Sequence, residues 1–181
     1  MSSASGVIIR RLQAEDDLGG FACEDPDLDE FLKADARRLE SQWVTRVYVA
    51  VCEDHVVGYA ALLADTVILK SGERRKLKLQ HDDSKQIPAL KIGRLAVDAA
   101  FRERTRGVGS GLVRHAFELA LALSQSIGCR LLTVDAYEGS VAFYQKLGFV
   151  SNKAHEDEAR STISMRLDLR SDPLPGWLQS N

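Results

Sequence analysis

Cysteine is scarce in this 181-residue chain, which has only Cys23, Cys52 and Cys129. Their number is odd and their spacings are wide, which argues against a disulfide framework and is typical of a reducing cytoplasm. The four histidines are scattered, and no two of them stand at a spacing typical of metal ligands. We therefore expect a cytoplasmic protein without a metal site.

Long apolar runs are also missing. The N-terminal stretch MSSASGVIIRRLQAEDD has no apolar core long enough for a signal peptide, and no segment approaches the roughly 20 apolar residues that cross a bilayer. The formal net charge is only −2, so no global basic surface for nucleic acid or anionic membranes is expected. The length predicts one domain over residues 1–181, with a core at about 7–169 and a tail at 170–181.

The spacing of apolar residues predicts a mixed α/β domain. Asp25 and Pro26 are typical of a helix start, and Glu53, Asp54 and His55 stand where a hairpin would turn. The charged segment 70–85 has no clear period and is interpreted as a long loop, and the tail as irregular. The predicted elements are a strand at 7–12, a helix at 25–42, a hairpin at 46–69, a strand at 89–98, a helix at 108–127, a strand at 129–136, a short helix at 140–147 and strands at 148–152 and 161–169.

A glycine-rich stretch, RTRGVGSG, precedes the helix predicted from Val108. The N-terminus of a helix has unpaired N–H groups and a partial positive charge, and glycines let an anion approach the backbone closely. Such a segment favours phosphate, and Arg102, Arg104 and Arg106 add positive charge. Glycine spacing alone fits a solvated loop equally well.

Two familiar phosphate motifs do not fit this stretch. A nucleotide P-loop has a lysine and a hydroxyl residue after its glycines, whereas Leu112 and Val113 follow here. A dinucleotide fingerprint has glycines at its first, third and sixth positions, and Gly107, Gly109 and Gly111 match only its beginning.

Three segments together resemble the GNAT superfamily of acetyl-CoA-dependent N-acetyltransferases. GRLAVD resembles the family's central strand, RTRGVG its Arg/Gln-x-x-Gly-x-Gly pyrophosphate loop, and LLTVDAYEGSVAFYQKLGFV the strand and helix that follow. The resemblance covers roughly residues 47–169. It implies the GNAT fold, a mostly antiparallel sheet of about six or seven strands with a splayed central pair, flanked by helices. It also implies acetyl-CoA as co-substrate.

The resemblance assigns roles to individual residues. Tyr144 would be the general acid that protonates the departing thiolate, a role that suits a hydroxyl protonated at neutral pH. Phe143 would pack near the cofactor. The backbone of Leu95, Ala96 and Val97 would contact the pantetheine arm and the acetyl carbonyl. The residues expected to hold the pyrophosphate are Arg102, Arg104, Thr105, Arg106, Gly107, Val108, Gly109 and Ser110.

Two departures from the family pattern affect these roles. The interval from Val97 to Gly107 is about two residues longer than usual, and Thr105 stands where glycine is common, which leaves open which arginine reaches the phosphates. Tyr137 stands seven residues before Tyr144, where many members have asparagine, so a hydrogen bond to the cofactor arm is lost or replaced.

The acceptor amine is less well defined. Many such enzymes use a glutamate on or near the central strand as general base, but no acidic residue lies between Ile87 and Val97. Asp98 and Asp135 are the nearest candidates, and Asp135 fits a satisfied polar group at a strand end better than a base. An α-amino group has a pKa of about 7.7–8.0 against about 10.4 for lysine, so it needs less help to lose its proton. We therefore expect an α-amino group or another weakly basic amine as the acceptor.

A narrower resemblance leads to one branch of the superfamily. FACEDPDLDEFLKADARRL, TRVYVAV and IGRLAVD are similar to a branch that includes toxins of toxin–antitoxin modules, which acetylate the α-amino group of aminoacyl-tRNA. There the arginine matching Arg94 and basic residues around the cleft contact RNA, and an antitoxin is the partner. The loop KSGERRKLK has five basic residues and one acidic residue, Glu73. Two interpretations stay open: the loop binds RNA phosphates, or it is an ordinary solvated loop.

Three functions remain after this comparison: acetylation of a small-molecule or peptide amine, acetylation of aminoacyl-tRNA, and non-catalytic binding of coenzyme A. Tyr144 and the intact loop argue against the third. Homodimers are common in the superfamily, so the apolar tail residues Leu174, Trp177 and Leu178 cover either a partner subunit or the chain's own core.

Overall fold

The computed structural model describes residues 6–80, 85–104, 107–153, 161–171 and 175–179. Seven strands are hydrogen-bonded in the order β1-β2-β3-β4-β5-β7-β6, and the pairs β1–β2, β2–β3, β5–β7 and β6–β7 are antiparallel. The predicted mixed α/β class and the number of strands are therefore confirmed. The strands are β1 Val7–Arg11, β2 Arg46–Cys52, β3 His55–Ile68, β4 Gln86–Val97, β5 Leu131–Tyr137, β6 Val150–Ser151 and β7 Thr162–Asp168.

The chain forms two compact units, and three elements contribute to both. The first unit comprises Met1–Leu63 and Ile92–Ala116, and the second comprises Ala64–Lys91 and Phe117–Asn181. The strands β3 and β4 and the helix α4 each begin in one unit and end in the other. The helices are α1 Pro26–Glu30, a π-helical turn η1 Phe31–Asp35, α2 Ala36–Ser41, α3 Ser71–Lys76, α4 Val108–Ser124, a 3₁₀ turn η2 Glu138–Ser140, α5 Val141–Lys146 and α6 Gly176–Gln179.

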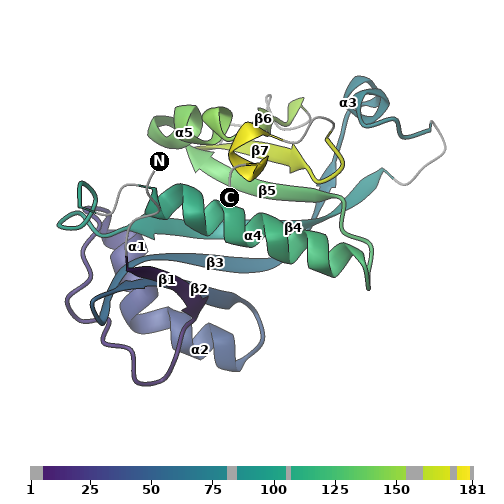
Figure 1. The fold of residues 1–181 in the computed structure, drawn as a ribbon. Helices are drawn as coiled ribbons and strands as arrows, with labels where there is room; N and C mark the ends of the chain where they lie inside the picture. Colours follow the sequence, from purple (N-terminus) through teal and green to yellow (C-terminus); the bar gives the residue numbers. More distant parts are fainter. Residues whose placement is uncertain (1–5, 81–84, 105–106, 154–160, 172–174, 180–181) are drawn as a thin grey trace. The chain divides into compact units, whose positions relative to one another are not determined.

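In the first unit, one nearly continuous helix lies against the face of β1, β2 and β3 (Figure 1). It begins as predicted, because the Asp25 side chain accepts hydrogen bonds from the N–H groups of Asp27 and Leu28, and Pro26 occupies the first turn. Phe31 and Leu32 are buried against Val47, Val49 and Tyr59 of the strands. The π-helical turn was not predicted, because its buried residues Phe31, Leu32 and Ala36 stand at spacings that an α-helix also produces.

The predicted hairpin between β2 and β3 turns at Glu53 and Asp54, whereas His55, which the sequence placed in the turn, begins β3. Both residues have positive φ, 48° and 64°, which is the conformation of the tight turns that match the twist of paired strands. The last pair of the ladder, Cys52 with His55, directly encloses this turn. The two-residue turn thus sets the pairing of β2 and β3 next to it, and the register shifts farther along at a bulge between Ala50 and Val51.

In the second unit, the expected loop at 70–85 is wrong in part, because Ser71–Lys76 form helix α3. Some charged side chains of this helix are exposed, but the carboxylate of Glu73 is buried, with 4% of the residue exposed. That carboxylate accepts hydrogen bonds from Nη1 of Arg166 on β7 at 2.6 Å, from the N–H of Lys153 at 3.1 Å and from the N–H of Lys70 at 3.0 Å. The helix is therefore held by a partner 93 residues away, which local periodicity cannot reveal.

Replacing Glu73 by glutamine is expected to lower the free energy of unfolding at pH 7 by about 3–5 kcal/mol, because Arg166 would keep a buried charge without its counter-charge. Burial opposes ionisation of Glu73, but the N–H groups of Lys153 and Lys70 and the Arg166 guanidinium outweigh it and lower its pKa. A lowered pKa stabilises the fold above the ordinary value of 4.5, and the gain is lost as pH falls through the folded value. Urea denaturation at pH 7 and pH 3 measures this difference.

The matched control is the double variant Glu73→Gln with Arg166→Met. It removes both charges, so its loss of stability should be smaller than the sum of the two single losses. A Glu73→Gln protein within about 1 kcal/mol of wild type at pH 7 would contradict a structural role for this ion pair.

Two further observations concern membrane helices and metal sites. Among the described residues, no helix combines the length and apolar character needed to cross a membrane. Within the same part of the chain, no three histidine, cysteine, aspartate or glutamate side chains gather as a metal site would require. The tail, expected to be irregular, contains the short helix α6.

Candidate active site

The glycine-rich stretch opens helix α4 within the first unit. Gly107 has φ of +92°, a conformation that favours glycine, and its carbonyl accepts hydrogen bonds from the N–H of Gly111 at 2.8 Å and from Oγ of Ser110 at 2.9 Å. The N–H groups of the first turn have no partner within the helix, so this end carries a partial positive charge. The predicted helix start therefore lies at Gly107–Ser110, and its role in binding pyrophosphate stays a prediction. Thr105 and Arg106 lie outside the described residues.

A glycine on β3 brings this helix end close to the sheet. A Cβ atom on Gly58 would lie 2.8 Å from Cγ1 of Val108 and 3.1 Å from the carbonyl oxygen of Ala96. The helix start and the end of β4 therefore approach β3 more closely than any larger residue would permit. Val108 is buried there, which fixes the first turn of α4.

The arginines before the glycines differ in their contacts. Arg102 donates hydrogen bonds to Oε2 of Glu24 and to the carbonyl of Cys23, each at 3.2 Å. Arg104 is exposed, and its guanidinium lies 5.5 Å from the centre of the Phe101 ring. Arg102 thus ties the loop to the segment before α1, whereas the described contact of Arg104 is with an aromatic face.

The end of β4 carries the residues predicted to line the cofactor arm. Ala96 is buried, Leu95 and Val97 are half-buried, and Arg94 is exposed. The guanidinium of Arg94 lies 4.2 Å from the centre of the Phe31 ring, which belongs to the π-helical turn. The π-turn, often found at functional sites, therefore presents an aromatic face to an arginine of the central strand.

Asp98, one of the two predicted candidates for a base, has a structural role instead. It is 4% exposed, and its Oδ2 accepts a hydrogen bond from the N–H of Ala22 while its Oδ1 accepts one from the N–H of Ala100, both at 2.9 Å. The N–H of Ala99 also donates to the carbonyl of Ala22 at 2.8 Å. Asp98 therefore connects the end of β4 to the segment that precedes α1.

In the second unit, Tyr144 lies on α5 inside an aromatic cluster. Its ring centre lies 5.0 Å from that of Phe143 and 5.4 Å from that of Phe149, both in edge-on geometry. The residue is only 5% exposed, and burial raises the pKa of its hydroxyl well above the usual value of 10. The hydroxyl is consequently protonated at every physiological pH, as a general acid requires.

Asp135, the other candidate for a base, is engaged in an ion pair. Its Oδ2 accepts a hydrogen bond from Nζ of Lys91 on the neighbouring strand at 2.6 Å. This fits the expectation of a satisfied polar group near a strand end. Tyr137 closes the same strand and is 46% exposed, so its ring is accessible to a ligand.

Comparison with known proteins identifies the family. The model of the acetyltransferase (GNAT) domain matches residues 43–151. The chain belongs to the GNAT acetyltransferase family. A curated relative, the tRNA-acetylating toxin of Mycobacterium tuberculosis (strain ATCC 25618 / H37Rv), is 32% identical over 141 residues, which are 77% of this chain and 82% of the relative. The present chain is accordingly an acetyl-CoA-dependent N-acetyltransferase.

Two solved structures resemble this GNAT chain over nearly its whole length. AtaT complexed with acetyl-methionyl-tRNAfMet has a TM-score of 0.78 and 25% identity, covering 96% of this chain and 99% of AtaT. An AtaT mutant toxin bound to the C-terminus of the antitoxin AtaR and to acetyl-CoA has a TM-score of 0.71 and 26% identity, covering 90% of this chain and 93% of that one.

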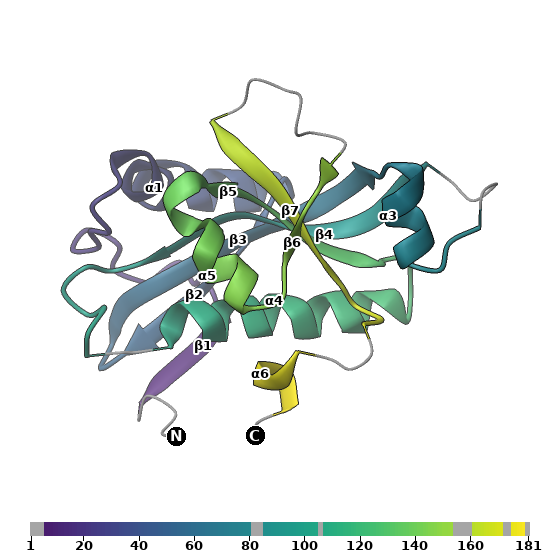
Figure 2. The ribbon, with the colours of Figure 1, turned by 90° about the horizontal axis from the view of Figure 1, so that it is seen from above.

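The C-terminal end of the tyrosine helix of this GNAT domain is fixed by the tail. The indole Nε1–H of Trp177 donates to the carbonyl of Leu147 at 2.9 Å, which satisfies one of the carbonyls left unpaired where α5 ends. The indole also packs edge-on against Phe117 of α4, with ring centres 6.2 Å apart. Figure 2 shows helix α6 beside α4. Trp177 therefore covers the chain's own core, one of the two alternatives left by the sequence.

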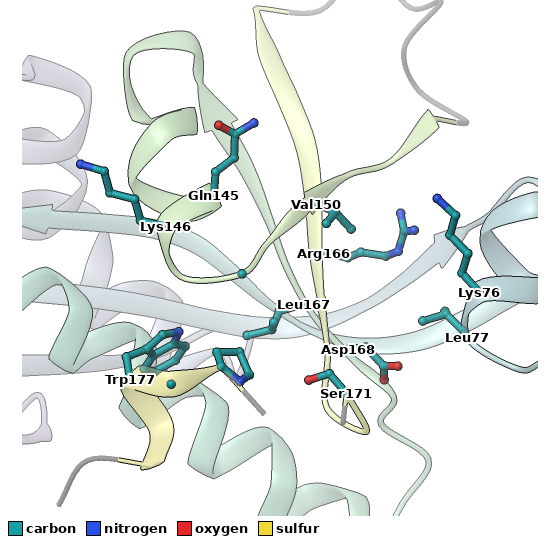
Figure 3. A pocket seen from close by; sticks show the side chains of 13 residues that line it. Lys76, Leu77, Gln145, Lys146, Val150, Arg166, Leu167, Asp168, Ser171 and Trp177 are labelled. Atoms are coloured by element: carbon teal, nitrogen blue, oxygen red, sulfur yellow. The ribbon is translucent and has the colours of Figure 1, made fainter. Parts of the chain in front are cut away.

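A pocket of about 650 Å³ adjoins this contact (Figure 3). Its wall includes Lys76 of α3, Lys146 of α5, Leu167 of β7 and Trp177 of α6. Neither Phe143 nor Tyr144 lines it, and in Figure 3 the labelled side chains come from the end of α5, from β6 and β7, from the end of α3 and from α6. The pocket therefore lies beside the contacts that hold the C-terminal end of α5, and the residues predicted to react do not line it.

Sequence reasoning missed three residues that hold this candidate site: Trp177, Phe31 and Asp98 in its capping role. Phe31 and Trp177 are apolar, and their spacing in the sequence predicts only burial. It does not indicate that Phe31 contacts the Arg94 guanidinium or that Trp177 donates to the carbonyl of Leu147. Asp98 was noticed only as a carboxylate near the central strand. Its position directly after a strand and before the turn at Ala99 and Ala100 is typical of an Asx cap, a signal that the sequence did offer.

Proposed function

We propose that this enzyme moves the acetyl group of acetyl-CoA to the α-amino group of an aminoacyl-tRNA, and acts as the toxin of a toxin–antitoxin module. The observation that carries the proposal is the engagement of both nearby carboxylates, since Asp98 caps the backbone and Asp135 pairs with Lys91. Without a dedicated base, an amine of pKa about 7.7–8.0 is a far better acceptor than a lysine. The 32% identical relative is named for acetylating tRNA.

The residues of the first unit would bind the pyrophosphate and the arm of acetyl-CoA. The N–H groups at Gly107–Ser110 and the α4 dipole favour the diphosphate. Arg104 would supply a positive charge, because Arg102 is already paired with Glu24. Leu95, Ala96 and Val97 would offer backbone groups to the arm. Phe143 would pack near the thioester.

The chemical step needs one proton donor from this chain. The acceptor nitrogen attacks the thioester carbonyl carbon, the C–N bond forms, and the C–S bond breaks. The sulfur leaves as a thiolate and takes the hydroxyl proton of Tyr144, and the nitrogen of the new amide loses its extra proton to water. A proton from water then restores the Tyr144 hydroxyl. Tyr144 is suited to this step because burial keeps its hydroxyl protonated.

Contact with tRNA would use basic residues that remain exposed. Lys70, Arg75, Lys76 and Lys78 are exposed around α3, whereas Arg74 of the predicted RNA loop is buried and donates to the carbonyl of Gln80 at 3.0 Å. Arg94, steadied by Phe31, is exposed at the end of the central strand. Substrate, antitoxin and coenzyme all fit a cytoplasmic protein, as do the three free cysteines.

The proposal is tested by supplying radiolabelled acetyl-CoA with charged tRNA, uncharged tRNA and a lysine-containing peptide. Label should pass to charged tRNA alone, and alkaline deacylation should release it as an N-acetylated amino acid. Transfer to the peptide or to a small amine at a higher kcat/KM would identify a metabolic acetyltransferase. Growth arrest on expression, relieved by the product of a neighbouring small gene, would establish the antitoxin.

A further inference from the structure

The most exposed large apolar side chain among the described residues is Trp43, which is 83% exposed directly after α2. Its φ is +62°, in the left-handed region where a bulky residue is an outlier. The backbone forms a Schellman motif, with the N–H of Val44 bonded to the carbonyl of Leu39 and the N–H of Trp43 to that of Glu40, both at 3.0 Å. Glycine is the usual residue at this position, so the indole is displayed at a conformational cost.

A groove of about 340 Å³ lies beside this indole, formed by the end of β1, the end of α2 and the start of β2. Three arginines line it, Arg11, Arg37 and Arg46, against one carboxylate, Glu40. Arg46 lies 6.0 Å from the centre of the Trp43 ring and donates to the carbonyl of Glu40 at 2.9 Å. The groove therefore combines an apolar anchor point with an excess of positive charge.

This groove lies far from the candidate cofactor site along β2. Arg46 begins β2 opposite Leu62, whereas Cys52 ends β2 opposite His55. The end of β4 joins that second end, because the N–H of Asp98 donates to the carbonyl of Val57 at 3.0 Å. At about 3.3 Å per residue, the strand separates the two ends by roughly 20 Å. Occupation of the groove thus requires no catalytic residue.

We propose that the Trp43 groove binds an acidic segment of a partner protein, which inserts a hydrophobic side chain against the indole. Tryptophan and arginine are the side chains most enriched at the energetic centres of protein interfaces. An acidic peptide complements the three arginines. Such a contact would explain why an exposed tryptophan occupies a strained backbone position, since within the described part of the chain the indole has only the contact with Arg46 at 6.0 Å.

Two other occupants fit the surroundings less well. RNA needs an extended basic track, but residues 24–40 contain seven acidic and three basic side chains, so a polyanion leaving the groove meets like charge. A second copy of the chain related by a two-fold axis would bring the same arginines against one another. A short segment with a few carboxylates avoids both penalties.

The test is binding of labelled 12-residue peptides to the full-length enzyme, followed by fluorescence anisotropy at 0.15 M salt. The peptides contain glutamates around one central leucine, phenylalanine or tryptophan, and a control peptide has serine in the centre. We expect at least one anchored peptide to bind saturably and the serine peptide to bind at least tenfold more weakly. Failure of all three anchored peptides would overturn the proposal.

The decisive variant is Trp43→Gly, which removes the anchor and relieves the left-handed strain. Peptide affinity should fall at least about 30-fold, while Tm rises by about 2–4 °C. A gain in stability together with a loss of binding cannot arise from unfolding. Unchanged affinity of the Trp43→Gly enzyme would overturn the proposal.

Arg11→Gln and Arg38→Gln form a matched pair of controls. Both arginine side chains are 56% exposed and each pairs with one carboxylate, but only Arg11 lines the groove. Arg11→Gln should weaken peptide binding several-fold and Arg38→Gln should leave it unchanged. Equal effects would show a non-specific attraction of charge and overturn the site.

Two further measurements exclude the rival occupants. If a 12-nucleotide single-stranded RNA displaced the peptide, the proposal would be overturned and the groove would be an RNA site. If wild type formed a concentration-dependent dimer that Trp43→Gly abolishes, the proposal would be overturned and the groove would be a dimer interface. None of these assays contains acetyl-CoA or charged tRNA. Their outcome is therefore independent of whether the enzyme acetylates aminoacyl-tRNA.

Discussion

Replacing Tyr144 by phenylalanine is expected to lower kcat for acetyl transfer about 10²–10⁴-fold, with no change in the affinity for acetyl-CoA. The change removes one hydroxyl from a side chain that is only 5% exposed and leaves the aromatic cluster of Phe143 and Phe149 intact. The thiolate would then leave without a positioned proton donor. Single-turnover rates with saturating charged tRNA, and calorimetry with acetyl-CoA, separate the two quantities.

Tyr59 provides a matched control for this variant. It is also a buried tyrosine whose pKa is raised by burial, and its hydroxyl donates to the carbonyl of Leu28 at 2.8 Å. Tyr59→Phe should lower the free energy of unfolding by about 1 kcal/mol and leave kcat nearly unchanged. The Tyr144→Phe enzyme should show the reverse pattern. If both variants lost activity in proportion to stability, Tyr144 would be a core residue and not an acid.

The pH dependence of the rate tests the same assignment. Because burial raises the pKa of Tyr144, its protonated form persists to well above pH 9, and no alkaline decline from this group is expected there. An α-amino acceptor loses its proton around pH 7.7–8.0, so kcat/KM should rise through that range and then become constant. A decline above pH 8 with a folded enzyme would contradict the proposed acid.

Local sequence patterns predicted the parts of this fold that local chemistry determines. The start of α1 follows from Asp25 and Pro26, and the hairpin follows from two residues that tolerate positive φ. The start of α4 follows from Gly107, since only glycine adopts its φ of +92° without strain. In each case the residue and its partner lie within four positions of one another.

The rest depended on partners that are distant in the sequence. Helix α3 carries no apolar period, and it is Arg166 that holds Glu73 and so orders a segment expected to be a loop. Likewise, nothing near Arg102 indicated that Glu24 and Cys23 would engage it, and this contact favours Arg104 for the phosphates. Because each of these contacts joins residues more than 70 positions apart, no window of the sequence contains both partners.

Replacing Gly107 by glutamate is expected to abolish acetyl-CoA binding while the fold persists. The new carboxylate would stand at the start of α4, where the pyrophosphate is proposed to bind, and a charge about 5 Å from a phosphate at an effective dielectric constant near 20 is repelled by roughly 3 kcal/mol. That repulsion alone weakens binding about 100-fold. Calorimetry with acetyl-CoA measures the loss.

Gly107→Gln separates the effect of charge from that of backbone strain. Both variants force a side chain onto a φ of +92°, and among the described residues a Cβ there would meet only Oγ of Ser110, at 3.8 Å. Glutamine should therefore weaken binding through strain alone, and glutamate should weaken it further, with the difference shrinking at high salt. The glutamate variant should be at least as stable as the glutamine variant, because an acidic residue in the first turn interacts favourably with the helix dipole. Equal affinities of the two variants for acetyl-CoA would place the pyrophosphate elsewhere than at the start of α4.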